Sequence, residues 1–105
     1  MTTEEQKQAV LEQEAADISA GKRADEFLAD PVVTNMLLAV EKKYMGEFQR
    51  AETDEARRTV WAKTRVLTDF VTEMRATVGR GQMATHTKET RERQEERSRR
   101  ASTRR

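Results

Sequence analysis

The sequence contains no cysteine, and only 5% of its 105 residues are aromatic. Without cysteine the chain has no disulfide, no thiolate nucleophile and no cysteine ligand for zinc. Packing alone must therefore hold the fold, and the composition is typical of a reducing compartment.

Long hydrophobic runs are also missing. No apolar stretch approaches the ~20 residues that a membrane-spanning helix needs. The segment Met1–Glu5 is acidic, whereas a signal peptide begins with a basic segment and continues with an apolar one. We therefore expect the protein in the cytoplasm, or in a particle that is assembled there.

Hydrophobic residues are scarce, at 35% against 37% charged residues. A chain of this length forms one domain at most and buries only about two-thirds of its unfolded surface. The core must be drawn from a subset of the chain, and part of the sequence is expected to remain unpacked. A large, enclosed active site is not expected.

Charge is distributed unevenly, although the formal net charge is only +1. Residues 88–105 carry eight basic and four acidic side chains, so this segment has a net charge of +4 and residues 1–87 have −3. The last nine residues contain no acid, and their five arginines are Arg97, Arg99, Arg100, Arg104 and Arg105. Such an arm favours an anionic partner, either nucleic acid or an acidic protein surface. No aromatic residue lies among the arginines, so base stacking is not expected.

Helical periodicity and capping residues predict an all-α fold. Thr2 with Glu5, or Thr3 with Gln6, has the spacing of a capping box, which predicts a helix to about Ala20. Its apolar residues are few, so it should pack weakly. Gly21 is expected to interrupt it, with a short turn of helix following.

Asp30-Pro31 is the strongest helix-start signal, because aspartate caps free amides and proline suits the first helical position. This helix is predicted to continue to about Ala51. Thr53 is a second capping residue, and the helix after it is predicted to end at Val78, where Gly79 and Gly81 supply residues that favour a helix C-terminus.

The short connection predicts that these two helices form an antiparallel hairpin. The expected organisation is an N-terminal helical segment (1–29), a helical hairpin core (30–81) and a basic polar tail (82–105). The tail is predicted to be either a solvated helix or disordered until it binds.

Residues typical of catalysis are nearly absent. His86 is the single histidine and lies in a polar stretch without a recognisable acid or nucleophile nearby. Scattered carboxylates do not indicate a metal site, and no phosphate-binding loop follows a strand. We predict no catalytic, cofactor-binding or metal-binding residues, no small-molecule substrate, and a protein that is not an enzyme.

The apolar surface of the predicted hairpin is wider than one neighbouring helix covers. Four large side chains fall outside the main apolar stripes, namely Leu38, Met45, Trp61 and Val66. They are either covered by the N-terminal helix or the Phe27-Leu28 turn, or they form a protein interface, a location that favours aromatic residues and methionine.

Residues 24–81 resemble small helical proteins from the head and packaging gene region of tailed bacteriophages. The resemblance lies in Phe27–Pro31, Glu41–Tyr44 and Thr53–Arg58, followed by Trp61 and Leu67. It implies a role in particle assembly, in the virion or the host cytoplasm, and no catalytic residue. Our leading hypothesis is a head-assembly accessory protein that oligomerises or packs on a larger phage structural protein.

Two alternatives remain open. One is a DNA-packaging adaptor similar to a small terminase subunit, although the acidic N-terminal region departs from the DNA-binding helix-turn-helix of that family. The other is a regulator that binds a host protein through the Trp61 face.

Overall fold

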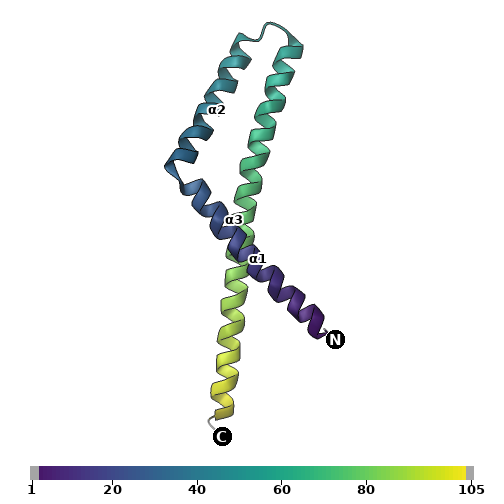
Figure 1. Ribbon diagram of the computed structural model, residues 1–105, viewed down its shortest axis with the longest axis vertical. Coiled ribbons are helices and arrows are strands. Elements are labelled where there is room, and N and C mark those ends of the chain that lie inside the picture. Colours follow the sequence, from purple (N-terminus) through teal and green to yellow (C-terminus); the bar gives the residue numbers. More distant parts are fainter. Residues whose placement is uncertain (1–2, 104–105) are drawn as a thin grey trace. The chain divides into compact units, whose positions relative to one another are not determined.

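The computed structural model describes residues 3–103, and in that range the chain is helical throughout apart from short connections. The helices are α1 (Glu4–Ala29), α2 (Pro31–Arg50) and α3 (Asp54–Thr103) (Figure 1). No strand occurs among the described residues. The prediction of an all-α fold is confirmed.

Each helix begins where the sequence predicts. Thr3 and Gln6 exchange hydrogen bonds, with the Thr3 amide donating to Gln6 Oε1 at 3.0 Å and the Gln6 amide donating to Thr3 Oγ1 at 3.2 Å. The Val32 amide donates to Asp30 Oδ1 at 2.9 Å. The Ala56 amide donates to Thr53 Oγ1 at 3.1 Å. These side chains satisfy amides that have no partner inside the helix.

The predicted glycine boundaries are wrong. α1 continues through Gly21, and α3 continues through Gly79 and Gly81 to Thr103. No glycine among the described residues has a positive φ. A helical glycine costs only about 1 kcal/mol relative to alanine, so a glycine stops a helix only when the surrounding structure favours a turn.

The chain divides into two compact units. One combines the N-terminal residues up to Arg23 with the residues from Thr77 onwards, and the other comprises Ala24–Ala76. We refer to them as the terminal unit and the central unit. Within residues 3–103, no helix combines the length and apolar character that a membrane crossing requires.

In the central unit, α2 lies beside the first part of α3 (Figure 1). The more buried residues recur at three- and four-residue intervals, which is the spacing of a helix–helix contact. On α2 they are Val33, Leu37, Val40 and Tyr44, and on α3 they are Val60, Leu67, Val71 and Met74. The Lys63 ammonium lies 3.5 Å from Glu47 Oε2 and joins the two helices at the edge of this contact.

In the terminal unit, residues 4–23 of α1 cross the later part of α3 at a pair of glycines. An ideal Cβ built on Gly21 would lie 2.7 Å from the Cα of Gly81. Further along, Arg91 donates two hydrogen bonds to the Glu14 carboxylate, at 2.8 and 2.9 Å. Small residues thus permit the crossing, and a charged pair fixes its register.

Candidate protein-interaction surface

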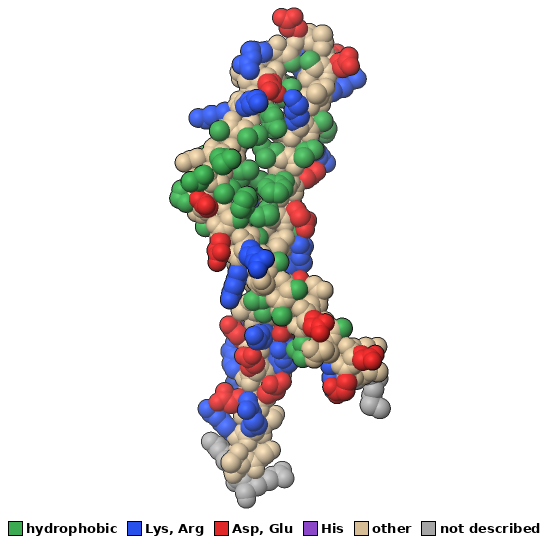
Figure 2. Space-filling view, in the orientation of Figure 1, with side chains coloured by type: hydrophobic (Ala, Val, Ile, Leu, Met, Phe, Trp, Pro, Cys, Tyr) green, Lys and Arg blue, Asp and Glu red, His purple; other side chains and the backbone are tan. Residues whose placement is uncertain are grey.

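Most of the large apolar side chains in the structure are exposed to solvent. Among the described residues only Ala24 and Val60 are buried hydrophobic residues, at 5% and 7% exposure. The exposed large hydrophobic residues of the central unit are Phe27, Val32, Met36, Leu38, Met45, Phe48, Trp61, Val66 and Phe70. Figure 2 shows hydrophobic side chains gathered over α2 and the adjacent part of α3. A contiguous apolar surface of this kind marks an interaction site more often than isolated exposed residues do.

Three of the four predicted interface residues lie along one flank of the α2–α3 contact. Met45 and Trp61 line one depression, and Leu38 lines a second. Glu41 lines both of these and also a third depression that contains Leu67 and Thr68. We call this continuous flank the α2–α3 groove.

Trp61 lies at one end of the groove. Its depression has a volume of about 280 Å³ and is also lined by Tyr44, Met45 and Phe48. The Arg65 guanidinium carbon lies 5.5 Å from the centroid of the indole ring, within cation–π range. The indole nevertheless remains 60% exposed, so the chain's own residues do not cover it.

Leu38 lies at the other end of the groove. Its depression is also lined by Leu28, Leu37 and Val71, together with Arg75. The two ends of the groove are therefore different in chemistry. One carries a large exposed aromatic ring, and the other an aliphatic depression with a cation.

Glu41 and Arg75 are the charged residues that line this groove. Both line the depression around Leu37 and Val71. Neither makes a hydrogen bond or an ion pair with any residue in the range 3–103. α2 thus presents an acid to the groove and α3 presents a base. Neither residue is predicted from the sequence as part of an interface, because their position beside the apolar flank depends on how the helices pair.

The fourth predicted interface residue, Val66, lies elsewhere. It is 69% exposed but lines none of the groove depressions. Five residues at ~100° each place it about 140° around α3 from Trp61. Phe70 lies on the same side as Val66 and packs edge to face against Phe27, with ring centroids 6.4 Å apart. This second flank is partly occupied by the chain itself.

The predicted anion-contact residues lie on the last turns of α3 or beyond them. Arg97, Arg99 and Arg100 are exposed on the helix, whereas Arg104 and Arg105 lie outside the described residues. Arg100 forms an ion pair with Glu96 at 2.8 Å, and Arg93 lies 3.9 Å from Glu89. The residues of each pair are four positions apart, so they are neighbours on the surface of the helix.

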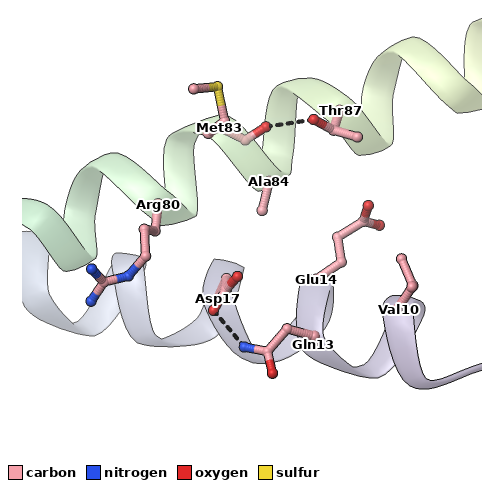
Figure 3. A pocket seen from close by; sticks show the side chains of 8 residues that line it. All are labelled: Val10, Gln13, Glu14, Asp17, Arg80, Met83, Ala84 and Thr87. Atoms are coloured by element: carbon pink, nitrogen blue, oxygen red, sulfur yellow. Dashed lines mark hydrogen bonds between the residues drawn. The ribbon is translucent and has the colours of Figure 1, made fainter.

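The terminal unit contains a depression of its own, lined by residues of both helices (Figure 3). Glu14 and Asp17 point from α1 toward α3, and Ala84 and Thr87 line the opposite side. The hydrogen bonds from Arg91 lower the pKa of Glu14 below its ordinary value, and the same pair raises the pKa of Arg91. The Glu14 side chain is only 10% exposed, whereas the Arg91 side chain is 35% exposed.

His86 is exposed on α3, and its backbone oxygen accepts a hydrogen bond from Thr90 Oγ1. Within residues 3–103, no three histidine, aspartate or glutamate side chains converge as a metal site would require. The residues that stand out are apolar and exposed, or charged and exposed.

Comparison of the chain with protein-family models, with curated proteins and with solved structures finds no significant match.

Proposed function

We propose that the protein is a non-enzymatic head-assembly accessory protein of a tailed bacteriophage. It acts through helix-mediated contacts of an α2–α3 hairpin with other protein surfaces. Its basic α3 terminus contacts DNA or an acidic coat surface. The site of action is the assembling particle in the host cytoplasm, or the virion itself.

The observation that carries this proposal is the excess of exposed apolar surface. Nine large hydrophobic side chains of the central unit are exposed, and only Ala24 and Val60 are buried. Burial of apolar surface is worth ~25 cal/mol per Å², so leaving this surface in water forfeits several kcal/mol. A binding partner that covers the surface recovers that free energy.

The arrangement of arginines near the end of α3 supports an anionic contact. Arg93, Arg97 and Arg100 recur at four- and three-residue intervals, so they lie along one stripe of the helix. A stripe of arginines presents several guanidinium groups to one extended partner at the same time. Phosphate backbones and acidic protein surfaces both meet that requirement.

The phage context depends on the resemblance of residues 24–81 to proteins of the head and packaging region. The small, helical and charged character of the chain is in keeping with that group. The proposal therefore has two parts, an assembly role supported by exposed surface and a phage setting supported by sequence pattern.

Cross-linking mass spectrometry of phage particles and assembly intermediates tests both parts. We expect the chain to be recovered with coat, portal or scaffold components, and Lys42 or Lys43 of α2 to cross-link to them. Recovery from neither mature particles nor intermediates would contradict an assembly role. Exclusive recovery with a host protein would favour the host-directed regulator instead.

A DNA-packaging adaptor is the second candidate, and the exposed Arg97 and Arg99 on α3 favour it. It requires direct binding to duplex DNA, with affinity that falls steeply as salt rises because each neutralised phosphate releases counterions. Duplex binding together with cross-links to the packaging motor would support this candidate over the accessory role.

A further inference from the structure

We propose that the α2–α3 groove is closed by a second copy of the same chain. In this dimer a two-fold axis runs parallel to the helices, and α2 of each copy lies on α3 of the other. The proposal rests on the assembly role proposed above and names its first partner. The result is a four-helix bundle in which every adjacent pair of helices is antiparallel.

The positions of residues along the groove make it complementary to itself. Trp61 lies level with Met45 and Phe48, because all three line one depression. A two-fold axis parallel to the helices keeps each residue at its level and places α3 of one copy opposite α2 of the other. The exposed indole of one copy therefore packs on Met45 and Phe48 of the other. The contact occurs twice, as a symmetric interface requires.

The charges of Glu41 and Arg75 favour this two-fold arrangement over the alternative one. Arg75 lies level with Leu38 and Glu41, because all three line the other depression. When α2 of one copy lies on α3 of the other, Glu41 meets Arg75 across the interface, twice per dimer. The alternative two-fold arrangement places α2 on α2 and α3 on α3, so acid-bearing helices face each other and arginine-bearing helices do the same. Opposite charges pair only in the proposed dimer.

The exposed area matches what a stable interface needs. Leu38, Met45, Phe48 and Trp61 are between 46% and 60% exposed. At roughly 100 Å² each, these side chains supply about 400 Å² of apolar area per copy. A standard interface buries ~800 Å² per partner, and its apolar share is ~56–65%. The four residues thus provide most of the apolar part, and neighbouring threonines, Glu41 and Arg75 provide the polar part.

Charge reversal of the pair tests the proposal on the full chain. Sedimentation equilibrium at tens of micromolar should give a dimer for the wild-type protein. Glu41→Arg and Arg75→Glu should each weaken the dimer by about tenfold, because two opposite-charge contacts become like-charge contacts. An equimolar mixture of the two variants should restore the dimer, because each copy then supplies the charge that the other lacks.

Two further variants provide the controls. Trp61→Ala should weaken the dimer strongly, because it removes the largest apolar contact. Val66→Ala removes an equally exposed side chain on the other flank and should leave the dimer unchanged. Circular dichroism of each variant confirms that the helices remain folded, so a loss of association is not mistaken for a loss of structure.

A wild-type monomer across this concentration range would overturn the proposal. So would a dimer that is indifferent to both charge reversals, or a mixture that fails to restore association. In each of these cases, recovery of the chain with phage structural proteins would show that the assembly role stands without this dimer.

Discussion

Gly21 of α1 and Gly81 of α3 face each other where the two helices cross. A Cβ on Gly81 would lie 2.8 Å from the Cα of Gly21 and 2.9 Å from the backbone oxygen of Asp17. Both neighbouring atoms belong to backbone, so no side-chain rotation relieves the contact. Glycine at these two positions therefore sets how closely α1 approaches α3.

The substitution Gly81→Ala should destabilise the terminal unit. The methyl group forces the helices apart, and overpacking of this kind costs about 1–3 kcal/mol. Gly79→Ala is the matched control, because a Cβ on Gly79 has no neighbouring atom within 4 Å. The Gly79→Ala variant should be more stable than the wild type by up to about 1 kcal/mol, because alanine has the higher helix propensity.

Amide hydrogen exchange of residues 4–23 compares the stability of the crossing in the two variants, because opening of the crossing exposes the amides of α1. We expect faster exchange in Gly81→Ala than in Gly79→Ala. Equal protection in the two variants would show that the crossing tolerates a methyl group and that the glycines do not set the approach.

Acidification should weaken the contact between Glu14 and Arg91. Hydrogen bonding to Arg91 lowers the pKa of Glu14 in the folded protein. The stabilisation is therefore fully present above the ordinary glutamate pKa of ~4.3 and is lost as the pH falls through the lowered folded-state value. Thermal unfolding of wild type and Glu14→Gln should differ at neutral pH and converge in acid.

Glu12→Gln is the control for this experiment, because Glu12 is an exposed residue on the same helix. It should unfold like the wild type at neutral pH. A gap between wild type and Glu14→Gln that persists unchanged in acid would mean that the carboxylate charge is not what Arg91 recognises.

The arginine stripe of α3 should contribute to duplex DNA binding through phosphates. Arg97→Gln and Arg100→Gln should each weaken binding and reduce the slope of log affinity against log salt by about 1. Arg57→Gln is the control, since Arg57 lies in the central unit and pairs with Asp54 at 2.8 Å. Fluorescence anisotropy across a salt series measures the slope. If Arg57→Gln reduces this slope as much as Arg97→Gln and Arg100→Gln do, DNA binding is not localised to the end of α3.

Local signals predicted the start of every helix, because capping depends on residues within three positions of each other. Thr3, Asp30 and Thr53 all cap as expected. The ends were not predictable in the same way. Gly81 is compatible with either a helix stop or a close helix crossing, and the sequence alone does not show that Gly21 faces it across such a crossing. The run of polar residues after Gly81 remains helical to Thr103 without a buried apolar stripe of its own.

The candidate site was predictable only in part. Helical periodicity placed Leu38, Met45 and Trp61 beside the main apolar stripe, and all three line the groove. Periodicity also placed Val66 beyond the other edge of the stripe, and Val66 lines none of the groove depressions. Glu41 and Arg75 were not predicted as interface residues, because a charged residue on a helix is ordinarily a solvated one. They matter because both side chains lack an ion-pair partner within residues 3–103 and line an exposed apolar groove.

Trp61 provides the most direct measurement of whether the central unit exposes more apolar surface than it covers alone. It is the only tryptophan in the sequence, so intrinsic fluorescence reports on this one side chain. Emission and acrylamide quenching, followed from nanomolar to high micromolar protein concentration, should show a blue shift and falling quencher access as the molecular mass doubles. Emission typical of a water-exposed indole at every concentration, with a monomeric mass throughout, would contradict the account.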